Sequence, residues 1–162
     1  GKRFLNLFAY TGSATVHAAV GGAISSVTID MSNTYLAWAR RNFVFNGIQG
    51  NHTLVRSNCL KWLSDQVDTH QKTRFDLIFL DPPTFSNSKK WMKHLISRKT
   101  MWHWYVMRWV CWRSMDFSTN FRRFKMNHEE LVKFKIDDIS KSMIPEDFAR
   151  NSKIHYCWKI TH

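Results

Sequence analysis

The 162-residue sequence lacks several features that mark broad classes of protein. It has no apolar run of the 18 or more residues that a membrane-spanning helix requires, and a polar residue interrupts Gly1–Asn6 too early for a signal-peptide core. Its only cysteines are Cys59, Cys111 and Cys157, whose number and spacing suit neither a disulfide framework nor a paired metal site. We therefore expect a cytoplasmic protein with reduced thiols, no bound metal and no membrane contact.

Acidic residues are also scarce, because 12 Asp and Glu stand against 24 Lys and Arg and give a formal charge of +12. Such a charge favours a polyanionic partner. Half of it comes from the stretch between Lys89 and Asp116, which carries a net +6 and five of the eight tryptophans. No ordinary domain composition has this density of tryptophan and methionine. The stretch is therefore atypical within the chain.

From Arg3 to Asp81, short apolar runs alternate with segments of helical periodicity. Alternation at this spacing predicts a parallel sheet with helices on both faces. We expect one α/β domain over 1–162, with a doubly wound, mostly parallel sheet that is incomplete or locally disrupted near 91–116. The expected strands are 4–8, 25–30, 53–56 and 75–80, and the expected helices are 15–20, 33–46 and 59–67.

Ligands of such sheets bind at the carboxyl ends of the strands, where this chain has polar signatures. Gly12 follows the first strand but belongs to no G-x-G-x-x-G pattern, so the loop suits an adenosine-type ligand better than a dinucleotide. Asp30 ends the second strand, where nucleoside-binding sheets hold ribose hydroxyls, and Asn58 and Cys59 follow the third. A single strand-end Asp is more often a helix cap or turn former. These three strand ends, together with the fourth, which ends at Asp81, favour a binding site.

The turn after the fourth strand, Asp81-Pro82-Pro83-Thr84-Phe85, is the sharpest signal. The two prolines fix φ near −65° and remove two backbone donors, which leaves carbonyl groups beside a carboxylate. Such a turn can bind the amino edge of a planar base while Phe85 stacks on its face. The alternative is a proline turn that merely ends a buried strand.

Several of these segments resemble class I S-adenosylmethionine-dependent RNA methyltransferases, which have a Rossmann-like fold. The motifs that carry the resemblance are Phe8–Ala14, Thr28–Ser32, Arg41–Gly47 and Asp76–Lys89. The chain is most similar to the C-terminal half of the bacterial bifunctional 23S rRNA guanine methyltransferase. That half is assigned methylation of guanine N7, and the other half methylates N2. The likeness covers 1–90 and 117–161 and fails between them.

The resemblance implies S-adenosylmethionine as cofactor and assigns roles to the strand-end residues. Asp30 would bind the ribose hydroxyls, Met31 would flank the adenine, and Asn58 stands where the family usually has an aspartate for the adenine amino group. The implied cofactor-binding residues are Phe8, Tyr10, Thr11, Gly12, Asp30, Met31, Asn58, Cys59 and Asp81. The implied catalytic residues, beside the methyl group and the target base, are Asp81, Pro82, Pro83 and Phe85.

The expected reaction is methylation of a guanine of 23S rRNA, with N7 favoured over N2. Guanine N7 has a free lone pair and no proton, so it needs no general base. Cytosine-C5 methylation would need a cysteine nucleophile near the base, and position 84 is Thr. The alternative is a non-catalytic remnant or RNA-binding fragment. The abrupt start suggests that an upstream half of the same enzyme completes it, and the basic cluster at 122–125 is a candidate phosphate contact.

The atypical stretch can be compared with the genetic code, because Trp and Met each have one codon. With suitable third bases at the other codons, reading Lys90–Ile96 one nucleotide earlier gives Met-Asp-Glu-Ala-Phe-Asp, and reading Thr100–Trp104 in the same frame gives His-Val-Ala-Leu. Both strings are typical of an amphipathic helix that would follow the proline turn. We therefore expect a double frameshift from about Trp91 to about Asp116. The alternative is a native surface of Trp and Arg that stacks on single-stranded RNA.

Overall fold

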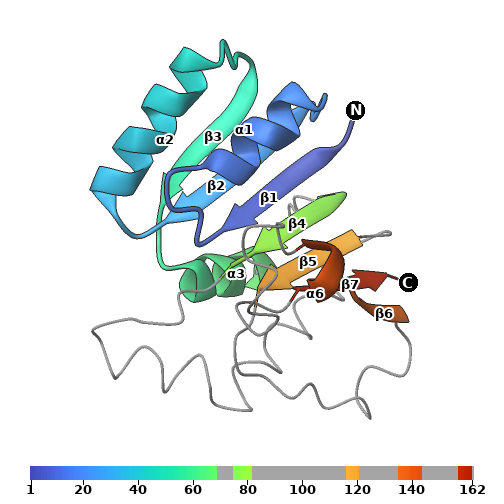
Figure 1. Cartoon of the computed structure of the whole chain (residues 1–162). Coiled ribbons are helices and arrows are strands. Elements are labelled where there is room, and N and C mark those ends of the chain that lie inside the picture. Colours follow the sequence, from blue (N-terminus) through green and yellow to red (C-terminus); the bar gives the residue numbers. More distant parts are fainter. Residues whose placement is uncertain (69–74, 82–115, 121–134, 144–156, 162) are drawn as a thin grey trace.

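The computed structural model describes residues 1–68, 75–81, 116–120, 135–143 and 157–161 (Figure 1). Within the first 81 residues it confirms the predicted alternation of strands and helices. The elements are β1 (Arg3–Leu7), α1 (Ser13–Val20), β2 (Ser25–Asp30), α2 (Asn33–Phe45), β3 (Asn51–Arg56), α3 (Cys59–Asp68), β4 (Leu77–Leu80), β5 (Asp116–Asn120), β6 (Lys135–Asp138), α6 (Ser140–Met143) and β7 (Cys157–Thr161).

All the strands belong to one sheet of order β3-β2-β1-β4-β5-β7-β6. β1 pairs in parallel with β2 and β4, and β2–β3 and β4–β5 are also parallel, whereas β7 runs antiparallel to β5 and β6. The expected doubly wound, mostly parallel sheet is therefore confirmed. The strand order reverses between β1 and β4, and ligands of open α/β sheets bind at the carboxyl ends of the strands at such a switch point.

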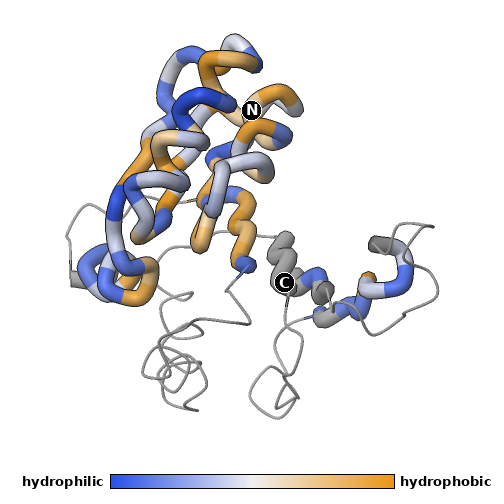
Figure 2. The backbone as a smooth tube through the Cα atoms, turned by 60° about the vertical axis from the view of Figure 1, so that its left-hand side comes forward, coloured by the Kyte–Doolittle hydropathy of each residue, from blue (hydrophilic) through white to orange (hydrophobic). Residues whose placement is uncertain are grey.

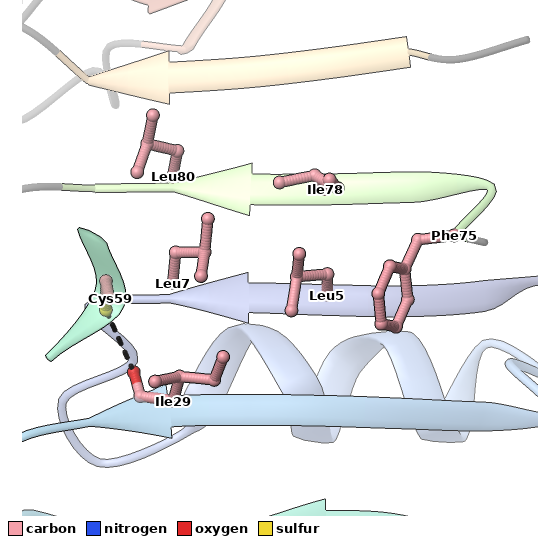
Figure 3. Close-up of a cluster of buried hydrophobic side chains, with 7 residues drawn as sticks. All are labelled: Leu5, Leu7, Ile29, Cys59, Phe75, Ile78 and Leu80. Carbon is pink, nitrogen blue, oxygen red and sulfur yellow. Dashed lines mark hydrogen bonds between the residues drawn. The ribbon is translucent and has the colours of Figure 1, made fainter. Parts of the chain in front are cut away.

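Side chains alternate along β1 and build a different interior on each face of the sheet. Leu5 and Leu7 lie in a buried apolar cluster with side chains of β2, α3 and β4 and with Phe75, which precedes β4. Figure 3 shows the other members as Ile29, Cys59, Ile78 and Leu80. β1 and β4 each contribute two side chains to it. Figure 2 colours the described backbone by hydropathy and shows hydrophobic stretches alternating with hydrophilic ones. The helical spacing of Cys59, Trp62 and Leu63 predicts that these residues share the buried face of α3, and the structure confirms it: Cys59 belongs to this cluster, and Trp62 and Leu63 pack against it.

The opposite face of β1 meets α1 through buried polar groups. Asn6 is 1% exposed, and its Nδ2 donates to Thr15 Oγ1 of α1 at 3.0 Å. Thr15 Oγ1 lies 2.7 Å from Thr28 Oγ1 of β2. Since a buried hydroxyl or amide is costly without a partner, this chain of hydrogen bonds fixes α1 over β1 and β2 in one position. The β1 member of this chain, Asn6, comes just before Leu7, where β1 ends and the loop to α1 begins.

The observed boundaries differ from the predicted ones where local backbone geometry decides them. β1 ends at Leu7 and not at Phe8, because Phe8 has φ 59, outside the range of a strand. β4 begins at Leu77, two residues later than predicted. Asp76, just before it, contacts the start of β1: its backbone N–H donates to the Arg3 carbonyl at 2.8 Å, and its Oδ2 accepts from the Arg3 N–H at 2.8 Å. The second of these hydrogen bonds lowers the pKa of Asp76. A serine directly before a helical segment predicts an N-cap, and Ser32 confirms it at the start of α2, where its Oγ accepts from the Tyr35 N–H at 3.3 Å.

The predictions for Pro82, Pro83 and Phe85 concern residues outside the described part of the chain, as do those for 91–115 and 122–125. Asp116 is described as the first residue of β5. In the described residues, no helix is long and apolar enough to cross a membrane.

Candidate functional site

The carboxyl ends of the parallel strands place the predicted strand-end residues at one edge of the sheet. Leu7 of β1 is in register with Ile29 of β2 and with Leu80 of β4, so Asp30 and Asp81 each follow a neighbour of the last β1 residue. Asp30 is in turn in register with Arg56, the last residue of β3. The loop after β1, the β2 end, the start of α3 and Asp81 therefore surround a single region, as the sequence predicts.

The loop that joins β1 to α1 has an unusual backbone. Phe8 has φ 59 and Tyr10 has φ 52, and Gly12 follows with φ 73. Side chains other than glycine rarely adopt this left-handed region, and such residues are often found at binding sites. Tyr10 is 52% exposed, so the strained turn presents an aromatic ring to solvent. The loop is therefore held in a shape that its own residues do not favour.

Gly12 is required by the protein interior as well as by its backbone angle. A Cβ at Gly12 would lie 2.8 Å from Ala39 Cβ and 3.6 Å from Phe43 Cε1, both on the buried face of α2. The sequence predicts that Gly12 permits close approach of a ligand. The structure shows a close approach of α2, so contact with a ligand stays a prediction.

Asp30 links the loop to the end of β2. Its Oδ2 accepts from the Tyr10 N–H at 2.9 Å, and its Oδ1 accepts from the Ser32 N–H at 2.8 Å. A carboxylate has about four lone-pair positions, so each oxygen retains capacity for one further donor. The side chain is half-buried at the edge of the sheet. Asp30 can therefore shape the loop and accept hydrogen bonds from a ligand at the same time.

Asn58 and Cys59 begin α3, and the structure gives both of them structural partners. Asn58 Oδ1 accepts from the Leu60 N–H at 2.9 Å and from the Lys61 N–H at 3.1 Å, as an N-cap residue does. A carbonyl oxygen with two acceptor positions is then fully used. The expected hydrogen bond from this oxygen to an adenine amino group would have to displace a capping bond, and it stays a prediction.

The thiol of Cys59 lies beneath the loop and not in the open part of the site. Cys59 is 1% exposed; its Sγ accepts from the Phe8 N–H at 3.3 Å and donates to the Ile29 carbonyl at 3.8 Å (Figure 3). Burial raises the pKa of Cys59 to about 12, so the thiol is neutral at physiological pH. Any contact of Cys59 with a cofactor must therefore come from its backbone, while its side chain supports Phe8.

The described carboxyl edge includes residues that the sequence analysis did not single out. Tyr35 of α2 packs edge-on against Tyr10, with ring centroids 4.5 Å apart. Met31, which the sequence does predict as a cofactor contact, follows Asp30 directly and is 49% exposed. The Arg56 Nε donates to the Met31 carbonyl at 3.3 Å, and the Asn42 Nδ2 donates to the Thr11 carbonyl at 2.9 Å. Asn42 lies within Arg41–Gly47, one of the segments that carry the family resemblance, but the sequence assigns no role to it. An asparagine inside a helix, where its propensity is poor, is a further signal that points to it.

Asp81, the last described residue of its segment, is exposed at the end of β4. Its backbone N–H donates to the Leu7 carbonyl at 3.5 Å, which holds it beside the start of the loop. In the described residues, no group of three or more His, Cys, Asp or Glu side chains could hold a metal ion.

Known proteins match this chain both in sequence and in fold. The family described as "conserved hypothetical protein 95" matches residues 1–109. The chain belongs to this family. Curated proteins similar to this chain include several named ribosomal RNA large subunit methyltransferase K/L. The relative from Allochromatium vinosum is 49% identical over 169 residues, which cover 100% of this chain and 22% of the relative. The relative from Saccharophagus degradans is 48% identical over 172 residues, with 100% and 21% covered.

Solved structures with the same fold include a protein of Streptococcus mutans described as a SAM-dependent methyltransferase. Its TM-score is 0.69 at 25% identity, over 100% of this chain and 45% of that one. The expected Rossmann-like methyltransferase fold is thereby confirmed. The chain spans about a fifth of the length of the curated relatives it matches.

Proposed function

We propose that this chain is the S-adenosylmethionine-binding, catalytic part of an rRNA methyltransferase that modifies a guanine of 23S rRNA. The observation that carries the proposal is the Asp30 carboxylate, held between Tyr10 and Ser32 at the sheet edge with acceptor capacity to spare. The names of the 49% and 48% identical relatives support the same reaction class, as does the description of the Streptococcus mutans structure.

The residues present fit the chemical groups of S-adenosylmethionine. A ribose diol needs an acceptor for its hydroxyls, and Asp30 offers one lone-pair position on each oxygen beyond its backbone partners. A planar adenine needs exposed apolar surface, which Tyr10, Tyr35 and Met31 provide at 52%, 39% and 49% exposure. The cofactor carries no phosphate, in keeping with a loop that contains Gly12 without a glycine-rich phosphate fingerprint.

The bound cofactor would supply a sulfonium methyl group that a nucleophile can attack directly. The protein's contribution is then to hold the two reactants close and in line, which alone accounts for several kcal/mol of a reaction barrier. Asp30 and the loop from Phe8 to Gly12 would orient the cofactor. Asp81, at the end of the adjacent strand, would face the target base, and we extend that role to Pro82, Pro83 and Phe85 on the strength of the sequence alone.

We favour N7 of guanine over N2 as the methyl acceptor. N7 needs no proton removed, whereas an exocyclic amino group must lose one. The described histidines do not offer a base at this edge: His52 is the second residue of β3 and bonds Ser26 at 2.9 Å near the amino ends of the strands, and His17 lies in the last turn of α1. The Asp81 carboxylate is the group that would favour N2 instead.

Calorimetry with S-adenosylhomocysteine tests the cofactor site. We expect binding by the wild-type chain and a loss of about 1–3 kcal/mol in Asp30→Ala, the scale for removing a charged acceptor. Asp65→Ala is the matched control, because Asp65 is an exposed carboxylate that pairs with Lys61 on α3 at 3.0 Å. Absence of binding at millimolar ligand to a folded wild-type sample would refute the proposal.

Radiolabelled cofactor and unmodified 23S rRNA test the reaction and its acceptor atom. We expect this chain alone to transfer methyl groups slowly, and we expect the chain joined to the remaining regions of a full-length relative to label guanine N7. Those remaining regions are the partner we propose, since base flipping and RNA approach must be shaped by more than the described site. A product labelled at N2 would show that the acceptor is wrongly assigned, and rapid turnover by the chain alone would show that no further region is needed.

A further inference from the structure

The strained loop between β1 and α1 is fixed by contacts from other elements. The peptide that joins Thr11 to Gly12 is bound at both ends: the Gly12 N–H donates to the Ala9 carbonyl at 2.8 Å, and the Thr11 carbonyl accepts from Asn42 Nδ2 of α2 at 2.9 Å. The first of these bonds belongs to the loop itself. The second comes from a residue 31 positions away in the sequence.

Asn42 is the only side chain for which the structure records a hydrogen bond to a loop carbonyl, within residues 1–68. It is half-buried on α2, one turn from Ala39, which touches the position where a Gly12 Cβ would be. The peptide therefore cannot rotate without losing the Asn42 bond or the Ala9 bond. Asn42 reaches the loop from α2 through this one hydrogen bond, and the Tyr10 ring of the loop, which packs against Tyr35 of the same helix, is 52% exposed.

We propose that Asn42 is a positioning residue for cofactor binding: its side-chain amide holds the Thr11–Gly12 peptide in the orientation that receives the cofactor. The inference rests on the proposed function, because it presumes that the loop from Phe8 to Gly12 contacts S-adenosylmethionine. Asn42 needs no contact with the cofactor for this role. Only a hydrogen-bond donor at its Nδ2 position satisfies the Thr11 carbonyl, so a carboxylate of the same shape would repel that carbonyl.

The test compares Asn42→Asp with Asn46→Asp. Asn46 caps the C-terminus of the same helix and donates from Nδ2 to the Asn42 carbonyl at 2.8 Å, so both variants lose an amide-to-carbonyl bond and add one negative charge near the end of α2. Only Asn42 reaches the loop. We expect Asn42→Asp to weaken S-adenosylhomocysteine binding about 10-fold, the ratio for one lost hydrogen bond of usual strength, and Asn46→Asp to change it less than 2-fold.

Two further measurements separate positioning from general stability. Thermal unfolding without ligand should give similar midpoints for the two variants. Hydrogen exchange of the Gly12 amide should become faster in Asn42→Asp and stay unchanged in Asn46→Asp. If Asn42→Asp does not fold, Asn42→Ala, which adds no charge, replaces it. We then expect the same loss of S-adenosylhomocysteine affinity and the same faster exchange of the Gly12 amide.

Equal affinity of Asn42→Asp and wild type, or an equal loss in both variants, would overturn the inference. Its failure differs from failure of the proposed function. If the wild-type chain binds no S-adenosylhomocysteine, the function is refuted; if the wild type binds and the Asn42 variants bind as well, only the role of Asn42 is refuted.

Discussion

Replacing Gly12 with alanine tests how closely the loop and α2 are packed. The new methyl group would lie 2.8 Å from Ala39 Cβ, nearer than two carbon atoms that are not bonded to each other can approach. Gly12 also has φ 73, in the left-handed region. Two costs therefore add. The left-handed backbone costs an alanine about 1–2 kcal/mol, and forcing an extra methyl into a packed interior costs about 1–3 kcal/mol. We expect Gly12→Ala to lower the free energy of unfolding by about 2–5 kcal/mol.

Gly47 provides a control that carries only the first cost. It has φ 62, and no atom lies within 4 Å of the position of its Cβ. Gly47→Ala should therefore cost about 1–2 kcal/mol, so the difference between the two variants reports the contact with α2. Urea unfolding followed by far-ultraviolet circular dichroism measures both values, since a change of midpoint at constant slope is a change of stability.

A compensating change at Ala39 completes the test. Ala39→Gly alone should cost about 1 kcal/mol, from the poorer helix propensity of glycine. Combined with Gly12→Ala, it removes the clashing atom, and the double variant should be more stable than the sum of the single losses by about 1–3 kcal/mol. Equal losses in Gly12→Ala and Gly47→Ala, together with simple additivity in the double variant, would refute the packing argument.

Three other predictions concern ionisation and the gene. Burial raises the pKa of Cys59 from 9.0 to about 12, so the stability that the neutral thiol contributes is complete below pH 9 and is lost as pH rises toward 12; unfolding between these values should depend less on pH in Cys59→Ala. The pKa of Asp76 is lowered from 3.8 by the Arg3 N–H, so its contribution is present above pH 3.8 and lost in acid, and Asp76→Asn should flatten the acid side of the stability profile. Resequencing the gene between the codons of Lys89 and Phe117 should reveal an insertion and a deletion that restore Met-Asp-Glu-Ala-Phe-Asp, and an unchanged reading frame would refute the frameshift.

Hydrophobic periodicity was enough to predict the first half of the fold. The spacing of Cys59, Trp62 and Leu63 predicts one buried helix face, and these residues do pack together. The sequence also predicts that the polar residues after the strands lie close together, because the carboxyl ends of parallel strands meet at one edge of the sheet. The register of β1, β2, β3 and β4 confirms this. Local pattern suffices here because each inference needs only neighbours along the chain or the topology of a parallel sheet.

The details of the site could not be predicted in the same way. The left-handed conformation of Phe8 is held by Cys59, 51 residues away, so no local propensity indicates it. Asn58 was interpreted as a ligand contact, although an asparagine just before a periodic helical segment is also the usual signal of an N-cap. The antiparallel pairing of β7 with β5 and β6 joins segments that follow the atypical stretch, where the periodic pattern is lost.

The ties to the loop span 20, 31 and 51 positions of sequence, from Tyr10 to Asp30, from Thr11 to Asn42 and from Phe8 to Cys59. Each of these contacts closes a long stretch of chain at a cost in entropy, so the loop takes its final shape only when β2, α2 and the start of α3 are in place. A molecule that recognises this shape therefore binds only chains whose first three strands and helices are already assembled. Its binding stabilises them by an amount that grows with the ratio of the free ligand concentration to the dissociation constant. A cofactor analogue in the growth medium or refolding buffer should then raise the yield of folded protein, acting as a chemical chaperone.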